Sequence, residues 1–156
     1  MGLKLTLKPH ERIVVNGCVI RNSGKRHVLI IDNRADVVRG EDLLPQDAPT
    51  SPVRQAYFLI QTCLISPETR ETLVPVIQEM LVKIISIFSR ERTACVFEAA
   101  NHIALQDYYK AMAALRGLMR HEALVLDYAA SQREAALAAA GPAPAEQATP
   151  AERVDP

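Results

Sequence analysis

The chain lacks several features that would assign it to a protein class at once. It has no tryptophan, only seven other aromatic residues in 156, and three cysteines (Cys18, Cys63 and Cys95) that are far apart and form no CxxC pair. Its four histidines form no close pair either, so neither a zinc site nor a disulfide framework is expected. No apolar run approaches the ~18 residues of a membrane helix, and no apolar secretory segment follows Met1. We expect a metal-free protein of the cytoplasm that needs no cofactor and contacts no membrane.

The net charge is zero for the whole chain but not for its parts. Residues 1–40 carry eight basic and three acidic side chains, a net charge of +5, so residues 41–156 carry ten basic and fifteen acidic side chains, a net charge of −5. The hydrophobic share of 49% is enough for a buried core. Two halves of opposite sign suggest that they have separate tasks.

The hydrophobic pattern changes along the chain as well. Residues 3–40 alternate with the period of a strand, and Asn16-Gly17 is a strong signal for a hairpin turn. Beyond a proline-rich segment the period becomes that of a helix, with Ser51 as an N-cap before Pro52. The predicted fold class is α+β: a small N-terminal five-stranded antiparallel β module, a meander or small barrel, followed by a C-terminal helical bundle of about four helices. The strands are predicted near residues 3–7, 12–15, 18–21, 26–31 and 36–39.

The predicted domains follow from these changes. They are a basic β module (1–44), a proline-rich hinge (45–52), a helical module (53–140) and a disordered tail (141–156). In the helical module, Ser66-Pro67 opens a second helix, and Pro75 predicts either a kink in it or a helix start nearby. The tail has four prolines in sixteen residues, and its single large apolar side chain, Val154, cannot offset the entropy of ordering it.

No pattern of catalytic residues is present. The chain has no GxGxxG, P-loop, GxSxG or HExxH sequence. Cys18 follows a hairpin turn within a predicted strand, which is a sufficient explanation for it. We therefore predict no catalytic and no metal-binding residues, and a protein that is not an enzyme.

The basic residues of the β module are candidates for contact with RNA phosphates, because neutralising phosphates releases counterions. The alternative is an ordinary solvated face. All seven aromatic residues follow residue 56, so the β module itself offers no platform on which bases could stack. The candidate RNA-binding residues are Lys4, Thr6, Lys8, Arg12, Arg21 and Arg39.

Arg39 closes the last predicted strand and is the main candidate among them. Its planar guanidinium could bind a phosphate, or a guanine edge through two hydrogen bonds. The competing prediction is an ion pair with Glu41 or Asp42 that fastens the end of the module.

The last predicted helix carries more apolar positions than one internal stripe needs. Leu115, Leu118 and Met119 are the example, since Leu118 is rotated by ~100° from its neighbour. These three residues are either a protein-partner surface or plain core.

Five segments, taken in their order along the chain, resemble the FlbT family of flagellar-biosynthesis regulators. They are residues 5–12, 15–22, 35–39, 52–58 and 107–111. The resemblance implies a post-transcriptional repressor that associates with the 5′ untranslated region of flagellin mRNA, promotes its degradation and acts alongside the small protein FlaF.

The β module is also similar to the carbon-storage regulator family, CsrA, in its strand number, its length and its ending at residues 37–41. That similarity implies that residues 3–6 and Arg39 contact RNA and leaves a homodimer open. Two functions therefore remain. The first is an RNA-binding repressor, and the alternative is an interaction or chaperone-like protein that acts mainly by binding FlaF or flagellin.

Overall fold

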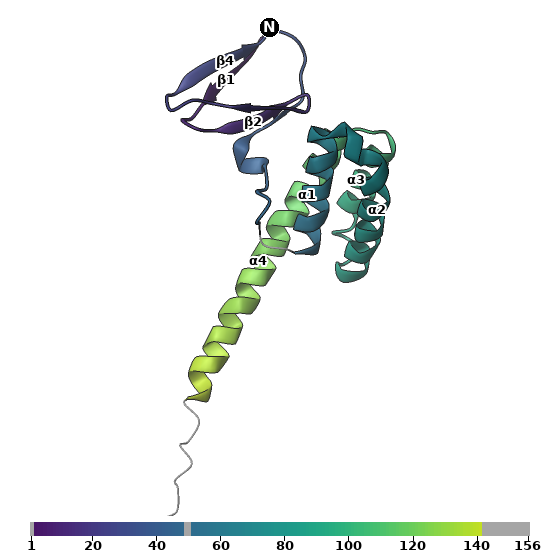
Figure 1. Cartoon of the computed structure of the whole chain (residues 1–156). Helices are drawn as coiled ribbons and strands as arrows, with labels where there is room; N and C mark the ends of the chain where they lie inside the picture. The colour runs from purple at the N-terminus through teal and green to yellow at the C-terminus, as the bar shows by residue number, and fades with distance from the viewer. Residues whose placement is uncertain (1, 49–50, 142–156) are drawn as a thin grey trace, which may run out of the picture. The chain divides into compact units, whose positions relative to one another are not determined.

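The computed structural model describes residues 2–48 and 51–141, and its first part is built from five strands (Figure 1). These are β1 (Leu3–Leu7), β2 (Arg12–Val15), β3 (Cys18–Arg21), β4 (His27–Ile31) and β5 (Val37–Val38). The predicted bounds of β2 and β3 are confirmed, whereas β4 begins one residue later than predicted and β5 is reduced to two residues.

The strands form two antiparallel sheets. β1 pairs with β4, and β2 lies between β3 and β5. Five antiparallel strands were predicted and are present, but their order is not that of a meander, because β1 pairs with a strand about twenty residues away. The predicted hairpin is confirmed: Asn16 and Gly17 both have positive φ angles, 47° and 82°, as a tight two-residue turn requires.

The described residues that follow form four α-helices and two short 3-10 helices. They are η1 (Gly40–Asp42), α1 (Pro52–Ile65), η2 (Pro67–Thr69), α2 (Arg70–Ile87), α3 (Ala94–Ala104) and α4 (Tyr108–Ala140). The α+β class with a helical C-terminal part is therefore confirmed. The predicted cap is present too, since the Ser51 hydroxyl accepts a hydrogen bond from the Arg54 N–H and Pro52 is the first helical residue.

Pro75 lies inside α2, which begins at Arg70 after the turn of η2. Of the two predicted possibilities, a helix start nearby agrees with this start, which lies five residues before Pro75. The predicted tail, apart from Gly141, lies outside the described residues.

One core connects the strands and the helices. Val14 and Val38 from the sheet and Leu44 from the following segment belong to the same buried cluster as Tyr57 of α1 and Leu115 of α4. The Tyr57 hydroxyl donates to the backbone carbonyl of Asp42 at 2.5 Å. The residues after η1 are thus fixed to α1 by both apolar and polar contacts.

The chain divides into two compact units, Met1–Glu122 and Ala123–Pro156, and each is described by itself. In the second unit, the helical residues 123–140 carry exposed large apolar side chains. These are Leu124, Val125, Leu126, Tyr128 and Leu137, between 49% and 75% exposed.

At Gly17, the turn of the β2–β3 hairpin lies close to the backbone of α1. A Cβ atom there would lie 2.7 Å from the Leu64 carbonyl oxygen of α1, and the φ angle of 82° disfavours any L side chain. Both the turn and its contact with α1 therefore require glycine at this position.

The two constraints make Gly17→Ala a sharp test of the contact between the hairpin and α1. We expect it to lower the free energy of unfolding by about 2 kcal/mol or more, from the cost of a left-handed conformation and the clash. Gly117→Ala is the matched control: this exposed glycine inside α4 has no atom within 4 Å of the added Cβ. It should raise stability by about 0.5–1 kcal/mol. Urea titrations of both variants would measure these changes, and a neutral Gly17→Ala would contradict the contact.

Candidate nucleic-acid interface

The six predicted RNA-binding residues all lie at the surface of the β module. Lys4 and Thr6 belong to β1, Lys8 follows it, Arg12 lies on β2, Arg21 on β3, and Arg39 directly after β5. All six are exposed except Arg39, which is half-buried. The structure brings three of the six, Thr6, Lys8 and Arg39, together with another residue, Glu11, that the sequence analysis did not select.

Glu11 connects Thr6, Lys8 and Arg39. One oxygen of its carboxylate, Oε2, accepts a hydrogen bond from the Lys8 backbone N–H at 2.8 Å, and the other, Oε1, pairs with Arg39 Nη2 at 2.9 Å. Arg39 Nη2 also donates to the Thr6 backbone carbonyl at 3.2 Å. The prediction that Arg39 pairs with Glu41 or Asp42 is therefore wrong, because its partner comes from the loop between β1 and β2.

Both contacts of Arg39 use Nη2, so they leave the other two nitrogens of the guanidinium unused. The Arg39 side chain is 32% exposed. It can therefore serve the fold through one nitrogen and still meet an anion from solvent with the others.

Arg12 and Arg21 are directly opposite each other in the β2–β3 pair. Side chains opposite one another in an antiparallel pair have Cβ atoms about 5 Å apart, and like charges there are destabilising. Among the residues that the structure describes, neither arginine takes part in a salt bridge. A pair of this kind fits a site for an anion.

Lys4 lies elsewhere on the module. Lys4 is opposite Ile30, and Thr6 is opposite Val28. On this face of the β1–β4 pair, the two polar side chains therefore lie next to two apolar side chains that are more than half exposed. Of these two polar residues, Thr6 contacts an arginine, Arg39, through its backbone carbonyl.

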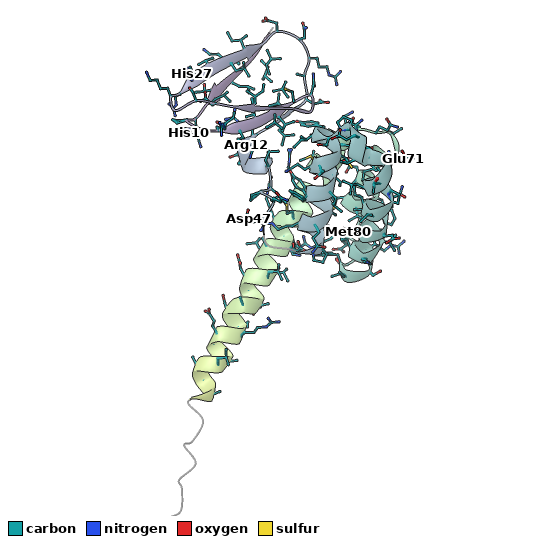
Figure 2. All side chains as sticks on the ribbon, in the orientation of Figure 1. His10, Arg12, His27, Asp47, Glu71 and Met80 are labelled. Carbon is teal, nitrogen blue, oxygen red and sulfur yellow. The ribbon has the colours of Figure 1, made fainter. Side chains whose placement is uncertain are left out.

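A cavity of about 640 Å³ opens beside the arginines, within the first unit of the chain. Lys8, Arg12 and Arg39 line it, as does His10 of the β1–β2 loop. Figure 2 labels His10 and Arg12, which lie on the same side of the β module. The other walls of the cavity are formed by η1, by residues 43–46 and by α1. Apolar lining comes from Val14, Val19, Leu43, Leu44, Phe58 and Ile65.

Asn22 holds the loop that carries Lys8. This buried side chain donates through Nδ2 to the backbone carbonyls of Lys8 at 2.7 Å and Lys25 at 2.8 Å, and accepts from the Ser23 N–H at 2.9 Å. The sequence indicated only a turn residue at this position. An asparagine at the start of Asn22-Ser23-Gly24 is typical of such side-chain to backbone bonds, but not of bonds that reach fourteen residues back.

The predicted protein-partner surface on α4 is taken up by internal packing. Leu115 is fully buried, Leu118 is 4% exposed and Met119 is half-buried against the core. Leu115 and Leu118 belong to the buried cluster, and Met119 packs against it.

Burial affects the ionisable groups of Cys63, Cys95 and Tyr57 in the same direction. Burial raises the pKa of the Cys63 thiol and that of the Cys95 thiol, so both stay protonated at neutral pH, whereas a nucleophile needs the thiolate. Burial likewise raises the pKa of the Tyr57 hydroxyl, which keeps the proton that it donates to Asp42.

Residues 2–48 and 51–141 lack two further features. No three histidine, cysteine or acidic side chains are grouped as metal ligands. None of the helices in this part of the chain has the length and apolar character to cross a bilayer.

The fold and the charge pattern define the class first: a small α+β protein whose β module carries a cationic surface. The model of the family described as "Flagellar protein FlbT" matches residues 3–126, and the chain belongs to that family. This confirms the resemblance found in the sequence.

Related proteins support the same assignment. The "Probable flagellum biosynthesis repressor protein FlbT" of Caulobacter sp. (strain K31) is 31% identical over 124 residues, which cover 78% of this chain and 94% of that protein. The protein of the same name from Rhodopseudomonas palustris (strain TIE-1) is 32% identical over 125 residues, covering 78% and 95%. The "Flagellum biosynthesis repressor protein FlbT" of Caulobacter vibrioides (strain ATCC 19089 / CIP 103742 / CB 15) is 31% identical over 126 residues, covering 78% and 87%.

These names describe regulators rather than enzymes, which confirms the prediction of a non-enzymatic protein. No solved structure matches the chain, and the resemblance of the β module to the carbon-storage regulator has no support.

The facing arginines allow a test of electrostatics that needs no ligand. Arg21→Glu replaces a repulsive cross-strand pair by an attractive one and should raise the free energy of unfolding by about 0.2–1 kcal/mol, less at high salt because exposed charges are screened. Arg34→Glu, in the loop between β4 and β5, is the matched control and should change stability by less. Thermal unfolding at low and high ionic strength measures both, and no gain from Arg21→Glu would mean that the two guanidinium groups do not repel each other.

Proposed function

We propose that the chain is a post-transcriptional repressor of flagellum biosynthesis that binds the 5′ untranslated region of flagellin mRNA in the cytoplasm and promotes its degradation. The observation that carries this proposal is the pair of facing arginines, Arg12 and Arg21, beside Lys8 and Arg39. Membership of the FlbT family and the names of the related repressors support it.

Phosphate binding explains why the two arginines face each other. Each phosphate placed between them would turn a repulsive pair into two attractive contacts and would release condensed counterions from the RNA. The net charge of +5 on residues 1–40 attracts RNA to this module rather than to the acidic remainder of the chain.

RNA binding of this kind should depend steeply on salt. Removing one phosphate contact should weaken binding to all RNAs alike and reduce the dependence of log K on log salt by about one unit. Contacts to base edges should instead change the preference for one RNA over another.

Arg12→Gln tests the phosphate contact. We expect weaker binding of flagellin leader RNA and of an unrelated RNA by the same factor, and a salt dependence lower by about one unit. Gel-shift titrations at three salt concentrations would measure both quantities. Arg34→Gln removes the same charge away from the site and should leave the slope nearly unchanged. Wild-type protein that does not bind leader RNA at any salt concentration would refute the proposed function.

A protein-binding function is the second candidate, and the exposed apolar side chains of residues 123–140 favour it. The predicted partners are FlaF and, as a further alternative, flagellin or a second copy of the chain. A helix with Leu124, Leu126 and Tyr128 all more than half exposed has apolar area to bury against a partner. Under this proposal, RNA effects are indirect.

Leu126→Glu tests whether this surface binds a partner, because it should remove partner binding without unfolding the protein. Leu126 is 53% exposed, so the variant should keep the melting temperature of the wild type but lose FlaF in a copurification assay. Leu118→Glu is the contrasting variant, since it places a charge in the core and should unfold the protein. Full retention of FlaF by a folded Leu126→Glu protein would exclude residue 126 from the interface, and sedimentation of both proteins would detect a homodimer.

A further inference from the structure

One wall of the cavity has no role in the phosphate contacts described above. Phe58 and Ile65 come from α1, and together with Val19 and Leu44 they give this wall an apolar surface. We propose that the cavity binds one unpaired nucleotide of an RNA strand, with its base against Phe58 and its phosphate at Lys8 and Arg12. This inference rests on the proposed RNA-binding function and adds a site to it.

The size of the cavity fits this occupant. Its volume of about 640 Å³ lies within the range of about 300–1,000 Å³ that is typical of small-molecule sites. Either a purine or a pyrimidine nucleotide is a ligand of this class. A base that is stacked inside a duplex could not enter, so the occupant must be unpaired.

Some of the charged side chains around the cavity are paired within the protein, and others are available to a ligand. Three cations (Lys8, Arg12 and Arg39) and two carboxylates (Glu11 and Glu41) line it, a net charge of +1 with neutral histidine. Glu11 is occupied by Arg39 and the Lys8 N–H. Of the remaining charges in the lining, the two cations Lys8 and Arg12 outnumber the one carboxylate, Glu41. Lys8 and Arg12 therefore provide the positive charge that a phosphate requires.

The Arg12–Arg21 pair is a second, independent reason to place the phosphate at this edge of the cavity. Arg12 lines the cavity and belongs to the same sheet face as Val14 and Val19, since residues alternate along each strand. The repulsion between the two guanidinium groups is greatest when no anion is present, so this edge is adapted to a ligand that carries negative charge.

The polar side chain deepest in the lining is already satisfied. Gln61 accepts from the Leu44 N–H at 2.8 Å and donates to the Leu44 carbonyl at 2.9 Å. Both atoms of its amide are bound to the Leu44 backbone, so the fold fixes the orientation of this side chain. We therefore expect the cavity to hold a base by apolar and stacking contacts, with little preference among the four bases.

Phe58 also changes a conclusion drawn from the sequence. The β module has no aromatic residue, which predicted that it could not stack bases. The fold places an aromatic side chain of α1 in the same cavity as Lys8 and Arg12, so stacking and phosphate binding become available at one site.

The test uses a short single-stranded RNA from the flagellin leader, labelled with a fluorophore, and measures binding to the full chain by anisotropy. Phe58→Leu keeps an apolar side chain but removes the ring, and should weaken binding about tenfold with an unchanged salt dependence. Phe58→Tyr keeps the ring and should bind nearly as the wild type does. Phe97→Leu, on an exposed site of α3, is the matched control and should have no effect.

A photocrosslink covers the case in which Phe58→Leu fails to fold. Wild-type protein bound to the same RNA with 4-thiouridine in place of uridine should crosslink to a peptide that contains residues 8–12 or Phe58. A crosslink confined to other peptides would overturn the inference.

The outcomes distinguish the cavity from the proposed function. If the wild type binds RNA, and folded Phe58→Leu binds it equally well, the cavity inference fails while the RNA-binding function stands. If a free mononucleotide such as AMP binds and is lost in Phe58→Leu but RNA does not bind, the cavity takes nucleotides from another source, and both the RNA-strand inference and the proposed function are refuted.

Discussion

The carboxylate of Glu11 is the contact on which the cationic site depends. It is only 12% exposed, and a shielded carboxylate is costly unless it is hydrogen-bonded and paired with a cation. The Lys8 N–H and the Arg39 guanidinium meet both needs. The same two contacts tie the loop between β1 and β2 to the residue after β5, segments that are 28 residues apart. They therefore fix where Lys8 and Arg39 border the cavity.

Sequence reasoning succeeded where neighbouring residues determine the structure. The Asn16-Gly17 turn and the Ser51-Pro52 helix start depend on backbone angles and hydrogen bonds within four residues, and both are present. It failed where the partner is distant. Alternation within β1 predicts a strand but not that β4 is its neighbour, and proximity in sequence wrongly favoured Glu41 or Asp42 over Glu11 as the partner of Arg39.

The candidate site shows the same division. Charge could be counted along the chain, so six basic and polar candidates could be selected, and three of them, Thr6, Lys8 and Arg39, meet around Glu11. An amphipathic pattern could not tell whether Leu118 faces the core or a partner, because both need an apolar side chain at the same helical spacing. The contribution of Phe58 was hidden for a related reason: it follows the β module by many residues and reaches the cavity only through the packing of α1 against the sheet.

The Arg12–Arg21 pair breaks a local rule of strand pairing, and such exceptions are concentrated where function opposes stability. An anion between the two side chains removes their repulsion. The relief of this repulsion therefore adds to the favourable free energy of anion binding. By linkage, an anion that binds only the folded protein stabilises it by an amount that grows with the anion concentration relative to its Kd. Salt acts on the pair in two ways, because it screens the repulsion in the free protein and also reduces the counterion release from RNA. Both effects weaken binding as salt rises, so the affinity of this site for phosphate should be more sensitive to salt than the same charges would be on separate strands.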